Sequence, residues 1–229
     1  MLRQKKNVTL KINNISKKYK KKVVLQRIDL EVASRKIVGI LGLNGSGKST
    51  LLSILAGVKP CDSGTFFVDD ENIFANEKKR REIIGYVPQG LPLIEELSGY
   101  DNLSLWYDAK TLKQQLEEGF LKKLGIPEFV KMQVSKMSGG MKKRLSIACA
   151  VAHNPSVLLL DEPMAALDLP CKQIISDYIV DFKNRGGIVL LASHDVMELD
   201  LCQEWYILKD GKLAPYQYDK DLKKLVNAL

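Results

Sequence analysis

A glycine-rich segment between an apolar run and a helix-like run constrains the fold of this chain more than any other feature. The segment is Gly42-Leu-Asn-Gly-Ser-Gly-Lys-Ser-Thr50, which follows the apolar residues 37–41 and precedes the leucine-rich residues 51–56. Glycines let the backbone curl so that N–H groups point inward, and the next helix adds a favourable dipole. Strand, loop and helix in this order are typical of a site for nucleotide phosphates, and the flanks disfavour an ordinary turn. The sequence therefore predicts that the chain binds a nucleotide.

The polar residues of this loop have distinct expected roles. We expect Lys48 to bridge the β- and γ-phosphates and the Ser49 hydroxyl to hold Mg²⁺. The other loop residues predicted to contact the nucleotide are Gly42, Asn44, Gly45, Ser46, Gly47 and Thr50.

Two adjacent acids end a second apolar run. Residues 157–160 are apolar, and Asp161, Glu162 and Pro163 follow them. A fully buried strand delivers polar side chains only at its tip, where ligands bind in open α/β sheets. Because successive strand residues face opposite ways, we expect Asp161 to reach Mg²⁺ and Glu162 to polarise the attacking water as general base. The alternative is a strand exit with two exposed acids.

Positive charge is concentrated at the start of the chain. The net charge of the 229 residues is +8, but residues 1–36 alone hold 12 Lys or Arg and only two acids. Five lysines flank Tyr19, namely Lys17, Lys18, Lys20, Lys21 and Lys22. We expect a solvated hairpin rim, with an anionic membrane surface or nucleic acid as the alternatives. Nucleic acid is disfavoured, because no aromatic residue besides Tyr19 interleaves with these lysines.

Length and hydropathy favour a single cytosolic domain over residues 1–229. The chain can bury a full core, no apolar run approaches the about 18 residues of a membrane span, and no signal-peptide core follows Met1. The four cysteines show no metal-ligand spacing and are expected to be free thiols: Cys61, Cys149, Cys171 and Cys202.

The order of apolar patterns indicates an α/β fold. Strands are expected over 8–15, 23–32, 37–41, 64–70, 83–87, 157–160 and 188–192, with a terminal hairpin turning at 209–212. Helices are expected from the phosphate loop to about 57 and over 138–152, 170–185 and 219–227. Between 90 and 137 only helical patterns occur, over 101–110 and 111–124, so we expect a helical lobe inserted between core parts 1–89 and 138–229.

With these residues identified, nearly the whole chain resembles the ATP-binding subunits of ATP-binding cassette (ABC) transporters. Seven motifs occur in the family's order. Besides the phosphate loop and the paired acids they are Tyr19 (adenine-stacking aromatic), Gln89 (lobe-connecting glutamine), Ser138-Gly139-Gly140-Met141 (signature), Ala166-Leu167-Asp168 (interface loop) and His194 (switch histidine). The resemblance implies a P-loop NTPase core with a mostly parallel central sheet, an antiparallel β subdomain and an inserted helical lobe.

The resemblance also implies that two subunits share each ATP. The signature residues Ser138, Gly139 and Gly140 begin a helix, and would bind the γ-phosphate held by the opposite subunit. Asp168 would contact the nucleotide from the interface loop. Tyr19 would stack on the adenine.

Two further residues acquire roles in hydrolysis from the resemblance. His194 would donate a hydrogen bond to the γ-phosphate and orient Glu162 or the water. Gln89 would contact Mg²⁺ and pass motion to the helical lobe. The other histidine, His153, is expected only to end a helix.

The sequence departs from the family pattern at four positions. Met141 stands where many members have Gln, and Arg35 stands where a turn glycine is usual. Met164 and Ala166 replace the commoner Thr or Ser and Gly before Asp168. These replacements bear on turnover more than on nucleotide binding.

The partners implied by the resemblance are a second nucleotide-binding subunit, in a homodimer or heterodimer, and an integral membrane permease. The chain would lie on the cytoplasmic face of the membrane. Residues 138–144 are similar to drug- and peptide-exporting members, and the chain stops soon after its last motif, so export is favoured over import. The alternatives are a soluble cassette ATPase of a cytosolic assembly system, such as iron–sulfur cluster assembly, and a nucleic-acid-associated cassette.

Overall fold

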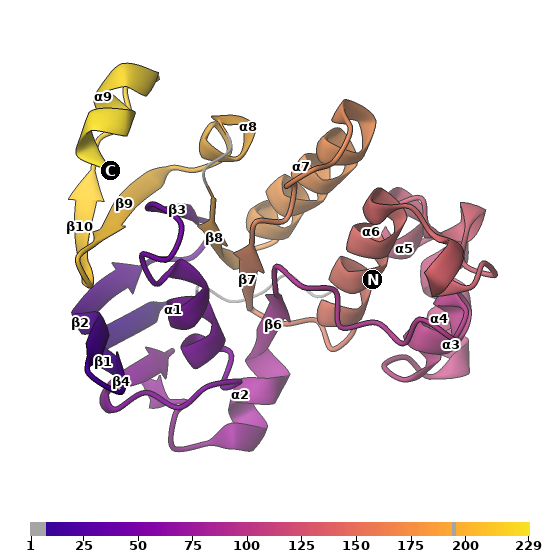
Figure 1. Ribbon diagram of the computed structural model, residues 1–229. Coiled ribbons are helices and arrows are strands. Elements are labelled where there is room, and N and C mark those ends of the chain that lie inside the picture. The colour runs from indigo at the N-terminus through magenta and orange to yellow at the C-terminus, as the bar shows by residue number, and fades with distance from the viewer. Residues whose placement is uncertain (1–7, 194–195) are drawn as a thin grey trace.

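A six-stranded sheet forms the centre of the molecule. The computed structural model describes residues 8–193 and 196–229 (Figure 1). The strands lie in the order β10-β9-β3-β8-β7-β6, and all neighbours are parallel except the β9–β10 hairpin. The strands are β3 (Ile37–Leu41), β6 (Ile84–Val87), β7 (Val157–Asp161), β8 (Ile188–Ala192), β9 (Glu204–Lys209) and β10 (Lys212–Tyr216).

The middle strands of this sheet are buried along their whole length. Every residue of β3, β7 and β8 is buried. Parallel strands covered on both faces need continuous apolar runs rather than alternation, and the three strands have them. The expected bounds of β3 and β8 are confirmed, and β7 extends one residue further, to Asp161.

A second, antiparallel sheet lies beside the first, in indigo and purple at the lower left of Figure 1. Its order is β2-β1-β4-β5, formed by β1 (Leu10–Tyr19), β2 (Lys22–Val32), β4 (Ser63–Val68) and β5 (Glu71–Asn72). One buried cluster joins its inner face, through Ile12 and Phe66, to the helix α1 (Lys48–Leu55) and to Ile40 of the central sheet. The phosphate loop before α1 is therefore held by both sheets.

Only helices and loops occupy the described chain between β6 and the helix α6 (Gly139–Ala150), apart from one isolated bridge between Ser98 and Gln133. The helices are α3 (Gly99–Ser104), α4 (Ala109–Glu117), α5 (Phe120–Lys123) and the 3-10 turns Ile126–Glu128 and Val134–Lys136. They lie at the right of Figure 1, beyond the edge strand β6. This arrangement agrees with the predicted fold class.

The predicted helices over 101–110 and 111–124 are wrong in their bounds. Three shorter helices replace them, because local caps interrupt the chain. Asp108 begins α4 by accepting a hydrogen bond from the Thr111 amide at 2.9 Å. Gly119 separates α4 from α5, and the Gln115 side chain accepts from the Phe120 amide at 3.1 Å. Capping residues therefore determine where these helices begin and end, and they override the boundaries expected from the spacing of apolar residues.

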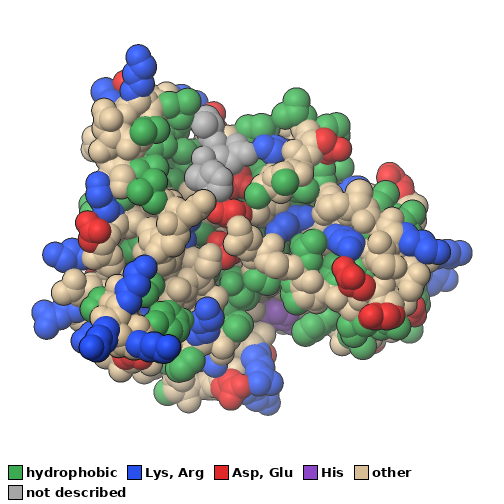
Figure 2. Space-filling view, viewed as in Figure 1, with side chains coloured by type: hydrophobic (Ala, Val, Ile, Leu, Met, Phe, Trp, Pro, Cys, Tyr) green, Lys and Arg blue, Asp and Glu red, His purple; other side chains and the backbone are tan. Residues whose placement is uncertain are grey.

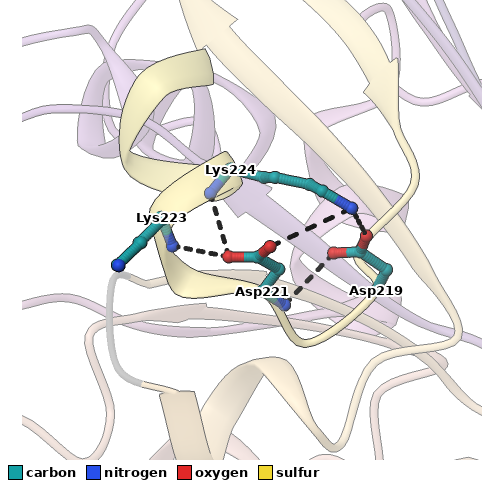
Figure 3. A network of polar contacts seen from close by, with 4 residues as sticks. All are labelled: Asp219, Asp221, Lys223 and Lys224. Atoms are coloured by element: carbon teal, nitrogen blue, oxygen red, sulfur yellow. Dashed lines mark hydrogen bonds and ion pairs between the residues drawn. The ribbon is translucent and has the colours of Figure 1, made fainter.

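The remaining helices are α2 (Glu77–Ile83), α7 (Leu169–Asn184), α8 (Val196–Leu199) and α9 (Leu222–Ala228). The sequence predicted α7 but gave no signal for α2, which buries none of its residues. Helix α9 begins later than expected because Asp221 is its N-cap, accepting hydrogen bonds from the amides of Lys223 and Lys224 (Figure 3). The Lys224 ammonium also pairs with Asp219 before the cap (Figure 3). Among residues 8–193 and 196–229, none of the helices combines the length and the hydropathy of a membrane span.

The turn before β3 is strained at Arg35, the position where the sequence lacked a usual glycine. Arg35 is exposed and its φ is +61°, in the left-handed region that favours glycine. Arg35→Gly is expected to raise the free energy of unfolding by about 0.5–1 kcal/mol, measured by urea denaturation. Arg35→Ala is the control, because it removes the same side chain but keeps the Cβ. An equal gain in both variants would contradict the assignment of strain to this backbone.

Candidate nucleotide site

The phosphate loop follows the carboxyl end of β3 and curls tightly against its neighbours. A Cβ on Gly42 would lie 2.6 Å from the Leu208 carbonyl oxygen, so no larger residue fits there. Gly47 has φ +113° and serves as the N-cap of α1 without any side chain. The amides of the first turn of α1 are thus left for an incoming anion, as expected of a phosphate loop.

Lys48 lies inside this loop. Its side chain is 5% exposed, and its Nζ donates hydrogen bonds to the carbonyl oxygens of Gly42 at 2.6 Å and Leu43 at 3.2 Å. Burial lowers the pKa of Lys48, while the nearby Glu162 and Asp161 carboxylates raise it. Positive charge is therefore stabilised in the loop by acids that follow a different strand.

Asp161 ends β7 and Glu162 follows it, two strands away from β3 in the sheet. Asp161 is 2% exposed and lies close to the Ser49 hydroxyl. Burial raises the pKa of Asp161, an effect that Ser49 and Lys48 oppose. A buried carboxylate next to a hydroxyl at the start of α1 is a suitable oxygen donor set for a magnesium ion.

Glu162 leaves the strand with a change of backbone direction. Its φ is +49°, and its amide donates to the Ala192 carbonyl oxygen at 2.9 Å. The Gln89 Nε2 donates to the Glu162 Oε2 at 3.0 Å, joining the segment after β6 to the segment after β7. The orientation of Glu162 is thus set by a strained turn rather than by strand alternation.

Lys48, Ser49, Gln89 and Glu162 line one cleft, whereas Asp161, Gly42 and Ser46 are not part of its lining. Its volume is about 460 Å³, within the range of small-molecule sites. The lining residues are Tyr19, Lys22, Val24, Asn44, Gly45, Gly47, Lys48, Ser49, Thr50, Gln89 and Glu162. Tyr19 ends β1 and is 41% exposed at this lining. The structure therefore brings together most of the residues predicted from the phosphate loop and the strand ends.

The signature residues line a different cleft. Ser138, Gly139 and Gly140 meet Asp168 in a cavity of about 450 Å³ that does not include Lys48 or Glu162. Ser138 is the N-cap of α6 and accepts from the Met141 amide at 3.2 Å. Asp168 is the N-cap of α7 and accepts from the Cys171 amide at 2.9 Å. Within one chain, these four residues do not reach the phosphate loop.

The interface loop before Asp168 carries two of the noted departures. Ala166 has φ +57°, which explains why a glycine suits this position. Met164 is fully buried, and its amide donates to the buried Glu198 carboxylate at 2.7 Å. The predicted His194 lies outside the described residues.

Sequence reasoning missed several residues near the site. Lys22 and Val24 line the nucleotide cleft from β2. Lys143 is 5% exposed on α6, with its Nζ 3.4 Å from the Pro88 carbonyl oxygen. Burial lowers the pKa of Lys143, and Asp161 counteracts this. No motif spacing marks these positions, and Lys143 stands between Lys142 and Arg144, a cationic run that gives no sign of burial.

Comparison with known proteins decides the family. Residues 25–165 match the family model described as ABC transporter. The chain belongs to the ABC transporter family. As an ABC ATPase it binds ATP and hydrolyses it.

Relatives of this ABC ATPase serve both directions of transport. It is 34% identical to the lipopolysaccharide export system ATP-binding protein LptB of Haemophilus influenzae, over 89% of this chain and 88% of that protein. It is 35% identical to the methionine import ATP-binding protein MetN of Helicobacter hepaticus, over 90% of this chain and 62% of that protein. One similar solved structure is a dimeric ATP-binding cassette in a post-hydrolysis state with ADP and Pi. It aligns with a TM-score of 0.81 and 27% identity, over 91% of this chain and 98% of that chain.

The glycines of the phosphate loop give a matched pair of variants. A Cβ on Gly47 would lie 3.1 Å from the Val24 carbonyl oxygen, whereas one on Gly45 meets nothing within 4 Å. Both positions have positive φ. Gly47→Ala is expected to lower the free energy of unfolding by about 2–3 kcal/mol and Gly45→Ala by about 1 kcal/mol, measured by urea denaturation. Equal losses would show that the contact with Val24 does not constrain Gly47.

Proposed function

We propose that this ABC ATPase drives a membrane transporter by enclosing ATP between two cassettes arranged head to tail. The observation that carries the proposal is the division of the site into two clefts. The phosphate loop and Glu162 line one, and Ser138 and Gly139 line the other. One chain holds both halves but does not bring them together, so a second cassette supplies the missing half. The dimeric cassette with ADP and Pi supports this arrangement.

The groups of the first cleft fit a triphosphate and a magnesium ion. Lys48 and the first amides of α1 bind the phosphates, and Tyr19 stacks on the adenine. Ser49, Asp161 and Gln89 hold Mg²⁺, which neutralises phosphate charge when bound. The support for these residues is the buried Asp161 carboxyl, whose pKa the nearby Ser49 hydroxyl lowers against the effect of burial.

Glu162 is the general base. Its carboxylate is held by the Gln89 amide at 3.0 Å and can accept a proton from a water between it and the γ-phosphate. His194 donates to the γ-phosphate and orients that water. Ser138, Gly139, Gly140 and Asp168 of the opposite cassette bind the nucleotide from the other side.

Hydrolysis then opens the pair of cassettes. In the closed dimer the γ-phosphate joins cationic and amide donors of both chains, and these contacts are lost when it leaves. The Gln89–Glu162 hydrogen bond connects this event to the segment that leads into the helices over residues 90–137, which we propose move as one lobe. Gln89 therefore couples the state of the nucleotide to the lobe.

The membrane subunit binds a groove beside that segment. The groove has a volume of about 490 Å³ and combines aromatic and apolar residues with cationic ones. It is lined by Ala56, Arg80, Arg81, Ile84, Tyr86, Pro92, Leu93, Trp106, Ser146, Cys149, Ala150 and His153. Its composition suits an apolar cytoplasmic helix with acidic residues at its end. Because residues 138–144 resemble those of exporters, we assign the export direction.

Glu162→Gln is expected to reduce steady-state ATP hydrolysis at least about 100-fold, because the amide cannot accept the proton from water. The variant should retain ATP and form a dimer that persists in size-exclusion chromatography. Glu95→Gln, on an exposed acid outside both clefts, is the control and should hydrolyse ATP normally. Normal hydrolysis by Glu162→Gln would remove Glu162 from its assigned role.

Trp106 and Leu105 give a matched test of the groove. Both are 61% exposed, but only Trp106 lines the groove. Trp106→Glu is expected to abolish co-purification of a polytopic membrane protein. The new carboxylate would repel the acidic residues of the partner helix, and the apolar surface of the indole ring would be lost. Leu105→Glu should co-purify that protein normally. Co-purification of cytosolic scaffold proteins in place of a membrane protein would contradict the transporter assignment.

A further inference from the structure

We propose that Asp62 is a positioning residue that holds the tip of β1 and so fixes Tyr19 at the nucleotide cleft. Asp62 lies in the segment between α1 and β4, outside the lining of the cleft. This inference rests on the proposed stacking of adenine on Tyr19.

The tip of β1 is poorly held by its own sheet. The pairing with β2 changes register between Ile15 and Lys17 and again between Lys17 and Lys18. Tyr19, the last residue of β1, is 41% exposed, so packing fixes it only partly. If the Tyr19 ring became ordered only when a base stacks on it, the entropy lost would weaken the affinity for the nucleotide. A further contact that orders the ring before binding is therefore needed.

Asp62 supplies contacts to three consecutive residues of this tip. Its amide donates to the Ser16 carbonyl oxygen at 2.9 Å. Its Oδ2 accepts from the Lys18 amide at 2.7 Å, and its Oδ1 lies 2.8 Å from the Lys17 Nζ. These bonds hold the carboxylate charged and lower the pKa of Asp62. The irregular end of β1 is therefore tied to the segment after α1.

Lys17 extends the contact from Asp62 to the aromatic ring. The expectation that all five lysines of the hairpin form a solvated rim is wrong for Lys17, which is 9% exposed. Its ammonium lies 5.5 Å from the centroid of the Tyr19 ring, and that of Lys59 lies 5.8 Å from it. Both cations are within the range of cation–π attraction. The charged side chains gathered over this sheet are visible at the lower left of Figure 2.

The same helix thus positions both ends of the nucleotide. Helix α1 begins at the phosphate loop, and the segment that follows its last turn carries Lys59 and Asp62. Because Asp62 fixes the tip of β1 relative to that segment, it fixes the separation between Tyr19 and the phosphate-binding amides. Such preorganisation raises affinity for a ligand that has both a base and phosphates.

Asp62→Ala tests this inference with two ligands. Its dissociation constant for Mg-ATP is expected to rise about fivefold, as loss of an ordered aromatic contact implies. Its dissociation constant for inorganic tripolyphosphate with Mg²⁺ should stay unchanged, because that ligand has no base. Equal weakening of both ligands would show a general structural effect and overturn the inference.

Asp29→Ala is the matched control. Asp29 is also an exposed carboxylate that accepts from a β1 amide, that of Asn14 at 2.8 Å, but it lies away from the tip. This variant should bind Mg-ATP as the unmodified chain does. Comparable weakening by Asp29→Ala would assign the effect to the sheet in general and contradict a specific role of Asp62.

Tyr19→Ala separates failure of this inference from failure of the proposed stacking. If Tyr19→Ala binds Mg-ATP normally, the stacking role itself is wrong. If Tyr19→Ala weakens ATP binding but Asp62→Ala does not, only the positioning role is wrong. In the double variant, Asp62→Ala should add nothing to the effect of Tyr19→Ala. Additive losses would overturn the inference.

Discussion

The structure depends on opposite charges that lie near one another at the carboxyl ends of buried parallel strands. β3 and β7 have no polar residue before their ends, so Lys48 and Asp161 are the first charged groups along their segments. Both are nearly inaccessible to water, and burial lowers the pKa of the lysine and raises that of the aspartate. Each group is stabilised in its charged form by the other. A triphosphate with a magnesium ion would bring the same two signs of charge to these two groups.

The division of the site follows from the order of elements along the chain. The phosphate loop and the acids meet through the central sheet, whereas the signature begins α6 after the helices between β6 and α6. That separation leaves Ser138 and Gly139 on another cleft with Asp168. When two copies of such a cassette share a nucleotide, its hydrolysis directly changes how strongly the two copies associate. In the proposed mechanism, Gln89 at the start of the connection transmits the change through its hydrogen bond to Glu162.

Much of the fold could be predicted because buried parallel strands need uninterrupted apolar runs. The bounds 37–41 and 188–192 therefore match β3 and β8. The amphipathic segments were less predictable: Asp108 and Gly119 divide residues 101–124 into separate helices, and α2 has no buried residue to create a pattern. Local hydrogen bonds set these bounds, and a period of apolar residues does not encode them.

The residues of the candidate site that belong to sequence motifs could be predicted, and the residues outside motifs could not. The phosphate loop, Gln89 and Glu162 lie on one cleft because strand ends on one edge of a sheet converge. Lys17 and Lys143 could not be assigned, since the burial of both lysines depends on partners distant in sequence, Asp62 and the Pro88 carbonyl group. Likewise, φ +49° at Glu162 depends on the bond of its amide to β8.

Complementation between two inactive variants tests the shared site most directly. Lys48→Ala disables the phosphate loop of one chain, and Ser138→Arg blocks the signature of another, so neither variant alone should hydrolyse ATP. A mixed dimer contains one intact phosphate loop facing one intact signature. The account predicts that mixing the two purified variants restores ATP hydrolysis, measured as phosphate release. A mixture as inactive as its components, with mixed dimers shown to form, would contradict the account.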